Sequence, residues 1–310
     1  MFDIVRRRYW YFGLSLLVIV PGLIALALWG LPLAIDYTGG TLLEVQFKET
    51  PRALEPEQIR QLVAEEGFPD STVQTSGTDI AVIRSKELNE ADKQKIITAL
   101  EAPYGPASVL TAETVGPSVG AEVAQSAALA VGAAALGILI YIWLAFRRLQ
   151  HAFRYGVCAI IAMLHDVLVV IGTAAIFGKV FGWEVDALFL TALLTVAGFS
   201  VHDTIVVFDR IRENLTIHRR LDYETVVNHS IVQTLDRSIN TQLTVVFTLL
   251  ALALFGGVTI RHFVILMLIG LVSGTYSSIF NAAQLLVVWE NGEIGKLFGR
   301  GKETTATVNS

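Results

Sequence analysis

The 310-residue chain contains few charged side chains and a single cysteine. Only 16% of its residues are charged, against about 25% in soluble domains, whereas 53% are hydrophobic. Cys158 alone cannot form an intrachain disulfide, and a metal site built on several cysteines is excluded. Because the apolar residues stand in long uninterrupted runs, the composition indicates a membrane-embedded protein rather than a soluble globule.

Two motifs of nucleotide-driven and zinc-dependent enzymes are also missing. The chain has no Gly-x-x-x-x-Gly-Lys-Ser/Thr segment for nucleotide phosphates and no His-Glu-x-x-His segment for zinc. We therefore expect no ATP hydrolysis, no metal, no cofactor and no enzymatic activity. The net charge of −5 argues against nucleic acid as a partner. An ion gradient is the expected source of any energy that the protein uses.

Six apolar stretches have about the 20 residues that a spanning helix needs. An even number places both termini on one side of the membrane. The connections on that side hold 14 lysines and arginines and the opposite short loops hold two, so the positive-inside rule predicts cytoplasmic termini. A signal peptide cleaved near Ala25-Leu26-Ala27 is the alternative for the first stretch. The stretches are residues 11–31, 124–146, 155–177, 187–208, 238–257 and 263–288.

Residues 36–122 have the pattern of a soluble domain and carry 15 acidic and seven basic residues, a net charge of −8. Leu43, Val45 and Phe47 alternate with polar residues, as in a strand. Further elements are a helix from Pro56, strands near Val73 and over 80–83, a helix capped by Asn89, and a strand over 108–115. The order βαββαβ predicts a ferredoxin-like α+β fold, placed outside the membrane between helices 1 and 2.

The predicted divisions are residues 1–35 for the N-terminus and helix 1, 36–122 for the α+β domain, 123–288 for helices 2–6, and 289–310 for a cytoplasmic tail. Glycines stand at both ends of the domain. Gly39 and Gly40 follow the first helix, and Gly116, Pro117 and Gly120 precede the second. They are either plain linkers or hinges about which the domain swings against the membrane helices.

Ionisable residues inside apolar stretches need a reason, since a charge at the bilayer centre costs at least about 2.5 to 3.5 kcal/mol. His165 and Asp166 stand in the third stretch, His202 and Asp203 in the fourth, and Arg237 at the start of the fifth. Asp203 and Arg237 are predicted to reach similar depths, so that an ion pair opposes the effect of burial on the carboxyl. Such a carboxyl suits a proton relay, for which these five residues are the candidates. A static buried ion pair is the alternative.

Hydroxyl and amide side chains accompany the ionisable ones. In the sixth stretch, Ser273, Ser277, Asn281 and Gln284 recur along one face of a helix. Between residues 209 and 237, apolar residues mix with charges, which predicts an amphipathic helix lying on lipid at the inner surface. The predicted polar pathway is lined by Ser200, Thr204, Asn240, Thr241, Ser277 and Asn281.

The chain resembles SecF, the smaller subunit of the SecD-SecF complex of bacterial protein export. The segments that carry the resemblance are Ile35-Asp36-Tyr37-Thr38-Gly39-Gly40, Val115-Gly116-Pro117-Ser118-Val119-Gly120, His165-Asp166-Val167, the run from Gly198 to Asn214, and Thr234 to Thr244. The resemblance implies six helices in an RND-like arrangement in the bacterial plasma membrane. It also implies partnership with SecD, the SecYEG channel, SecA, YajC and translocating preproteins. The proton-motive force would help to move preproteins outward after SecA has acted, and Asp203 and Arg237 fall on positions implied for proton passage.

His202 departs from the family pattern, which usually has asparagine before the aspartate. A histidine titrating near pH 6.5 either joins the relay or replaces the hydrogen bond of the amide. A different class of function, an RND-type proton-driven exporter of lipid or small molecules, would use the same relay. The 87 mostly polar residues of the outer domain offer little volume for the substrate pocket of such an exporter.

Overall fold

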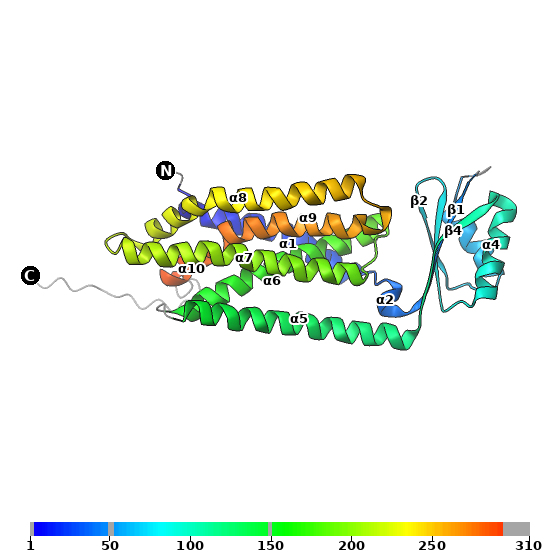
Figure 1. Cartoon of the computed structure of the whole chain (residues 1–310), viewed down its shortest axis with the longest axis horizontal. Helices are drawn as coiled ribbons and strands as arrows, with labels where there is room; N and C mark the ends of the chain where they lie inside the picture. The colour runs from blue at the N-terminus through cyan, green and yellow to red at the C-terminus, as the bar shows by residue number, and fades with distance from the viewer. Residues whose placement is uncertain (1–2, 49–52, 148–150, 294–310) are drawn as a thin grey trace, which may run out of the picture. The chain divides into compact units, whose positions relative to one another are not determined.

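The computed structural model describes residues 3–48, 53–147 and 151–293 (Figure 1). Among these residues, six helices are long and apolar enough to cross a membrane, and each overlaps one of the predicted stretches, although several extend beyond its bounds. The predicted tail from residue 294 onward lies outside the described residues. The six helices are Val5–Trp29, Pro117–Phe146, Ala152–Phe181, Ala187–Ile217, Tyr223–Phe255 and Ile260–Glu290.

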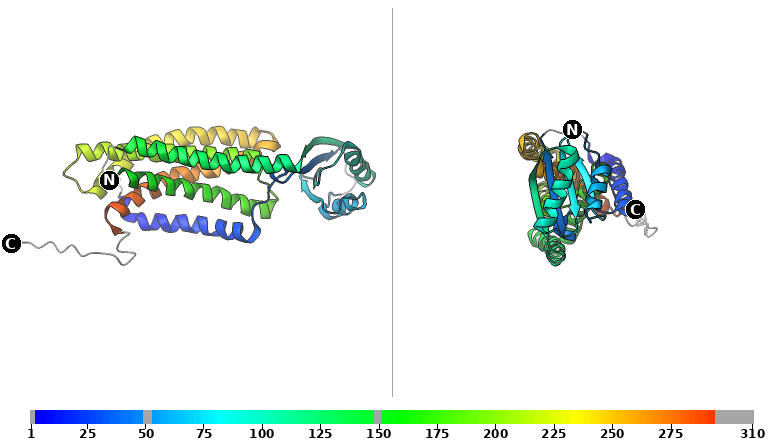
Figure 2. Two further views of the ribbon diagram at one scale, coloured as in Figure 1. Left: turned by 90° about the horizontal axis from the view of Figure 1, so that it is seen from below. Right: turned by 90° about the vertical axis from the view of Figure 1, so that its right-hand side faces the viewer.

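The chain divides into two compact units. The helical unit comprises the described parts of Met1–Gly30, Ala133–Ile176 and Thr191–Ser310, and the α+β unit comprises Leu31–Gly132 and Phe177–Leu190. The helical elements are η1 (Val5–Arg7), α1 (Arg8–Trp29), α5 (Pro117–Phe146), α6 (Ala152–Phe181), α7 (Ala187–Ile217), α8 (Tyr223–Phe255), α9 (Val258–Ser277), the π-helix η2 (Ser278–Ala282) and α10 (Ala283–Glu290). Within the helical unit, α6 to α9 run side by side (Figures 1 and 2).

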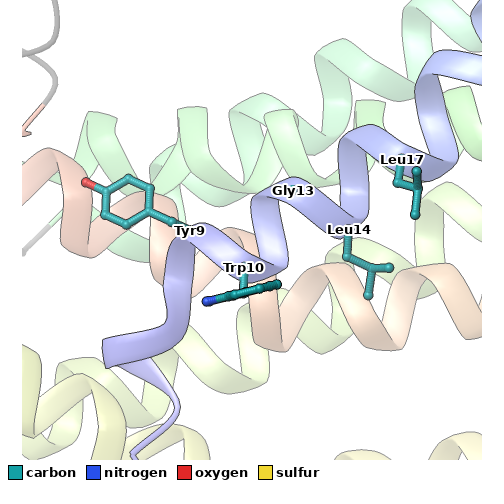
Figure 3. A pocket seen from close by; sticks show the side chains of 5 residues that line it. All are labelled: Tyr9, Trp10, Gly13, Leu14 and Leu17. Atoms are coloured by element: carbon teal, nitrogen blue, oxygen red, sulfur yellow. The ribbon is translucent and has the colours of Figure 1, made fainter.

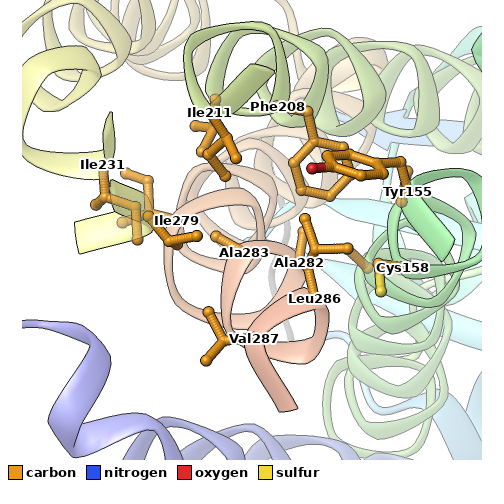
Figure 4. Packing of buried hydrophobic residues seen from close by; sticks show 14 of the residues in the cluster. Tyr155, Cys158, Phe208, Ile211, Ile231, Ile279, Ala282, Ala283, Leu286 and Val287 are labelled. Carbon is orange, nitrogen blue, oxygen red and sulfur yellow. The ribbon is translucent and has the colours of Figure 1, made fainter. Parts of the chain in front are cut away.

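The core of the helical unit lies where α6, α7 and α8 meet the last span (Figure 4). Tyr155 and Cys158 of α6 contribute to it, as do Phe208 of α7 and Ile231 of α8. Small residues of the last span, such as Ala282, let the neighbouring helices approach closely. The polar side chains described below are therefore held between tightly packed helices.

Glycines set the crossing of α1 and α6. A Cβ atom added to Gly172 would lie 2.6 Å from the Cα of Gly22, and one added to Gly22 would lie 2.8 Å from the Cα of Gly172. No side chain fits between backbones at that distance. The contact therefore requires glycine on both helices, as in other membrane helix pairs that approach through small residues.

The α+β domain has the predicted ferredoxin-like order. Its elements are α2 (Ile35–Thr38), β1 (Gly40–Phe47), α3 (Pro56–Glu65), β2 (Thr72–Ser76), β3 (Ile80–Ser85), α4 (Glu90–Tyr104) and β4 (Ala107–Val115). The antiparallel sheet has the order β2-β3-β1-β4. Leu43, Val45 and Phe47 are buried against α3 and α4 as their alternation predicts, and Asn89 caps α4 by accepting from the Asp92 amide at 2.9 Å.

The segment between the fourth and fifth spans does not form a separate surface helix, so that prediction is wrong. α7 runs on to Ile217 and α8 begins at Tyr223, where Asp222 caps the new helix. Asn214 Nδ2 donates to Ser230 Oγ at 2.9 Å across the resulting hairpin. Ile211 and Val227 are fully buried here. The apolar residues that suggested a lipid-facing stripe instead pack the helices of the hairpin against the rest of the helical unit.

Candidate functional site

Asp166 is the centre of a buried hydrogen-bond cluster, which we call the Asp166 cluster. Its side chain has no exposed surface and stands near the middle of α6. Ser200 of α7 and Ser277 of α9 donate to Oδ2 at 2.6 and 2.5 Å, and Ser273 of α9 donates to Oδ1 at 2.7 Å. His165 Nδ1 lies 2.9 Å from the same Oδ1. One carboxylate therefore joins three helices.

Four donors around two oxygens are what an ionised carboxylate can accept, because it has about four lone-pair sites and no proton of its own to place. His165 Nδ1 joins the three hydroxyls as a fourth donor in the tautomer that carries the ring proton on that atom. The sequence predicts both residues as relay candidates and Ser200 and Ser277 as pathway residues. The structure shows that these two serines and Ser273 share the Asp166 carboxylate. Both carboxylate oxygens and the three serine hydroxyls have partners there, whereas His165 Nε2 is buried and has no hydrogen-bond partner among the described residues.

A second pair of hydroxyls continues the polar path from the Asp166 cluster along the last span. Thr204 Oγ1 and Ser278 Oγ lie 3.0 Å apart, and Ser278 also donates to the Ser200 carbonyl at 3.0 Å. Ser278 begins the π-helix η2, a rare distortion that often occurs at functional positions. Asn281 lies in the same π-helix, but its side chain pairs with Ser15 of α1. Of the predicted pathway residues, Ser200, Thr204 and Ser277 thus lie together.

Asp203 is buried in a different way. It is 3% exposed, and its Oδ2 accepts from Gln242 Nε2 of α8 at 2.6 Å. The His202 Nδ1 atom lies 3.5 Å from Asp203 Oδ1, while the His202 side chain remains 66% exposed. Asp203 stands three residues after Ser200, less than one turn of α7, so the two aspartates are close along the helix axis.

The predicted ion pair between Asp203 and Arg237 is not formed among the described residues. The contacts of Asp203 with Gln242 and of Asn214 with Ser230 set the register of α7 against α8. Arg237 stands five residues before Gln242, so this register places it about 7 Å along the helix axis from the level of Asp203. The Arg237 side chain is exposed. The sequence predicts equal depths for Asp203 and Arg237 because both are counted from the ends of the apolar stretches. Both helices extend beyond those ends, so the count does not give their relative level.

Polar side chains are also exposed on the outer faces of α7 and α8. Besides His202 of α7 and Arg237 of α8, the predicted pathway residues Asn240 and Thr241 of α8 are exposed. Thr241 satisfies its own hydroxyl by donating to the Arg237 carbonyl at 2.7 Å. Asn240 and Thr241 therefore do not line the buried cluster.

Gln242 is the site residue that the sequence reasoning missed. It lies inside the polar run from Thr234 to Thr244, in which most side chains point outward and only some are buried. The available signal was its spacing from Ser238, because residues four apart share a face of a helix. Both Ser238 and Gln242 are buried.

The glycines at the ends of the α+β domain are packed against each other. Gly39 ends α2 with φ +73°, and a Cβ on it would lie 2.8 Å from the Cα of Pro117. A Cβ on Gly120 would lie 2.8 Å from the Gly39 nitrogen, and one on Gly40 would lie 2.5 Å from the Ser85 carbonyl oxygen. Gly116 has open space around it. Close backbone contact explains three of these glycines, and a hinge motion at this place stays a prediction.

Residues 116–120 also have the spacing Gly-x-Ser-x-Gly of serine hydrolases. A serine nucleophile of that class needs a histidine base within hydrogen-bond reach. None of the six histidines of the chain falls in the α+β unit. The spacing here therefore accompanies backbone packing and gives no hydrolase site.

The remaining candidate places are a metal site and a surface hollow on α1. In the described part of the chain, no group of three His, Cys, Asp or Glu side chains could hold a metal ion. A shallow hollow of about 540 Å³ on α1 is lined by Tyr9, Trp10, Gly13, Leu14 and Leu17 (Figure 3). Trp10 is 81% exposed near the start of the span, a position typical of the aromatic residues at a membrane interface.

The fold and the site together define a six-helix membrane protein with one ferredoxin-like domain and buried carboxylates between its helices. The family described as "Protein export membrane protein SecD/SecF, C-terminal" matches residues 95–292, and the "SecD/SecF GG Motif" matches residues 25–51. The protein translocase subunit SecF of Anaerolinea thermophila is 54% identical over 305 residues, which cover 97% of this chain and 98% of that protein. The SecF of Thermobaculum terrenum is 51% identical and is covered completely.

Longer relatives are named SecDF. The protein translocase subunit SecDF of Bacillus subtilis is 35% identical over 95% of this chain, which covers 39% of that protein. The crystal structure of SecDF from Thermus thermophilus, a translocon-associated membrane protein, has a TM-score of 0.83 at 33% identity. It matches 94% of this chain and 39% of the SecDF chain. The chain belongs to the SecD/SecF family of protein export membrane proteins. The relatives that it matches over nearly their whole length are SecF subunits.

Proposed function

We propose that the chain couples proton flow through its membrane helices to the outward movement of preproteins. In this proposal it works with SecD at the SecYEG channel, after SecA has acted on the preprotein. The single observation that carries the proposal is the environment of Asp203. This carboxyl is buried, has one close donor in Gln242, and adjoins an exposed imidazole.

A relay carboxyl must gain and lose a proton without dismantling its surroundings. Protonated Asp203 can still accept from Gln242 through one oxygen, because a carboxylic acid keeps acceptor capacity. His202 lies beside the same carboxyl with its side chain exposed, and an imidazole can accept and donate a proton through its two ring nitrogens. Asp166 is less suited to this role, because protonation would remove an acceptor from the four groups that share it.

The exposed polar face of α7 and α8 supports a second membrane subunit. An uncovered arginine or amide within a span is costly in lipid, and such residues in membrane proteins usually face protein or water. His202, Arg237 and Asn240 therefore favour helices of a partner on this face. The SecDF relatives are more than twice as long as this chain, which supports SecD as that partner.

The distribution of basic residues supports the proposed orientation, with both termini and the α7–α8 hairpin inside the cell. Arg210, Arg212, Arg219 and Arg220 all stand in or beside this hairpin. Positively charged connections are retained on the inner side. The acidic α+β domain would then face outward, where the translocating preprotein emerges. The proposal contains no catalytic step on a substrate and needs no cofactor.

The test is Asp203→Asn in proteoliposomes that contain the partner subunits and the translocation channel. We expect normal insertion and copurification with SecD, and loss of at least ten-fold in the part of translocation that depends on a proton gradient. Asp209→Asn is the matched control, because Asp209 is exposed on the same helix and only pairs with Arg212. Full gradient-dependent stimulation in the Asp203→Asn variant would overturn the proposal.

A further inference from the structure

The loop between α6 and α7, residues 182–186, is bound to the α+β domain, and we call it the connector. Both belong to the α+β unit. Arg84 of β3 places its Nε atom 2.5 Å from Oε2 of Glu184, and each side chain is 18% exposed. Because both side chains are largely shielded from water, the attraction between them is screened less than that between surface side chains.

Backbone hydrogen bonds attach the connector at a second point. Val185 N donates to the Pro32 carbonyl at 2.8 Å, and Ala34 N donates to the Val185 carbonyl at 2.9 Å. Leu33 and Val185 thereby form a parallel β-bridge. The connector is thus joined to the chain segment that leads from α1 into the α+β domain.

The start of α7 is capped by one side chain of the connector and one of the α+β domain. Asp186 accepts from the Phe189 amide at 2.8 Å, which is an ordinary capping bond within the helix start. Asp36 of α2 accepts from the Ala187 amide, also at 2.8 Å. Tyr37, the next residue, donates from its hydroxyl to the Asp186 carbonyl at 3.1 Å. Orphan amides of α7 are therefore satisfied by a side chain of the α+β domain.

Close packing leaves the connector little freedom. Gly182 has φ +70°, and a Cβ on it would lie 2.7 Å from the amide nitrogen of Gln74. At the end of α6, a Cβ on Gly178 would lie 2.3 Å from Cγ of Pro32. The connector is a fitted part of the α+β domain rather than a free loop.

We propose that Arg84 and Glu184 are positioning residues that make the α+β domain follow the movements of α6 and α7. The inference deepens the proposed function and rests on it. α6 carries Asp166 and α7 carries Asp203, and both helices run directly into the connector. A shift between these helices on protonation would distort the connector. Its ion pair, β-bridge and cap would pass that distortion to β3, to the segment before α2, and to α2 itself.

The charges around the connector make the contact able to open. Three carboxyls gather at the connector: Glu184 pairs with Arg84, Asp36 accepts from the Ala187 amide, and Asp186 accepts from the Phe189 amide. Burial raises the pKa of Glu184 although Arg84 opposes this, and Asp186 and Asp36 raise it further. The Nε and Nη1 atoms of Arg84 are both buried, and neither makes a hydrogen bond among the described residues. The desolvation of the two charges therefore offsets much of their attraction, so the ion pair can separate when the connector is distorted.

The test is the exchange of the two charges. Arg84→Glu and Glu184→Arg should each lower gradient-dependent translocation at least five-fold, and the double variant should recover to within two-fold of the natural protein. Protonation of Asp203, followed by its infrared carboxyl band, should be unchanged in all three. Lys86→Glu is the matched control, because Lys86 pairs with Asp70 on the exposed surface of the same domain.

Amide hydrogen exchange gives a readout that does not depend on transport. Protection of the Val185 and Ala34 amides should fall at least ten-fold in Arg84→Glu and return in the double variant. Unchanged translocation or unchanged protection in the single variants would overturn the inference, and so would loss of the Asp203 infrared signal. Failure of the proposed function looks different, because Asp203→Asn would then translocate normally while Arg84→Glu still lost amide protection.

Discussion

Asp166 and Asp203 are both buried carboxyls on apolar helices, and their surroundings differ in kind. Asp166 receives hydrogen bonds from α7, α9 and its own helix, so that both of its oxygens are saturated. Asp203 has one close donor, Gln242, and lies next to an imidazole that is mostly exposed. A carboxylate shared by three helices contributes to their packing. Asp203 has fewer donors, with His202 Nδ1 lying 3.5 Å from its second oxygen, and we propose that it exchanges a proton. Both carboxyls are buried, so the number of donors rather than burial distinguishes their surroundings.

The largest expected effect comes from the same truncation at both positions. Asp166→Ala should lower the free energy of unfolding by about 3 kcal/mol or more, because three hydroxyls and an imidazole lose their acceptor and each unsatisfied buried group costs about 1–3 kcal/mol. Asp203→Ala leaves only the Gln242 amide without its acceptor and should lower the free energy of unfolding by about 1–2 kcal/mol. Thermal unfolding of the purified variants in detergent measures both. Equal losses would erase the distinction between the two carboxyls.

A steric change sharpens the comparison by loosening α6 without touching a polar group. Gly22→Val should cost about 1–3 kcal/mol by overpacking against the backbone of Gly172. Gly13→Val on the same helix has open space around it and should change stability by about 0.5 kcal/mol or less. The Asp203 infrared band should be the same in both variants. A Gly22→Val protein as stable as Gly13→Val would show that α1 does not hold α6 in place.

The smallest expected effect concerns the acids outside the membrane spans. Burial raises the pKa values of Glu184 and Asp186 in the folded protein, so the folded state binds protons more tightly than the unfolded chain. Their contribution to stability is therefore fully present below their ordinary pKa values, which for Glu184 is 4.5. It is lost as the pH rises through the raised values.

Glu184→Gln should flatten this pH dependence, because the neutral amide has no charge to desolvate. Hydrogen exchange of the connector amides between about pH 4 and pH 8 measures the slope, and Glu57→Gln on the exposed face of α3 serves as the control. A slope that is unchanged by Glu184→Gln would show that Glu184 does not contribute to the pH dependence.

Local patterns predicted most of the architecture. Six apolar runs of sufficient length had to become spanning helices, since no other structure satisfies the backbone in lipid. The alternation around Val45 and the Asn89 cap depend on neighbours within a few residues, so both could be recognised before folding. The predicted pairing of Asp203 with Arg237 is wrong because it depends on the register of α7 against α8. That register is set partly by the hydrogen bond between Asn214 and Ser230, far along the chain from both residues of the predicted pair.

The sequence by itself determined the number of spans, the ferredoxin-like order of the outer domain, and the membership of Asp166 and Asp203 in a polar group within the membrane. Only the tertiary structure decided which side chains meet them. Ser200, Ser273 and Ser277 converge on Asp166 from positions up to 111 residues away, and Gln242 reaches Asp203 across a hairpin. The physical reason is that helix formation follows from local hydrogen bonds and hydrophobicity, whereas a hydrogen bond between helices depends on crossing and register. Those are set by packing over the whole bundle.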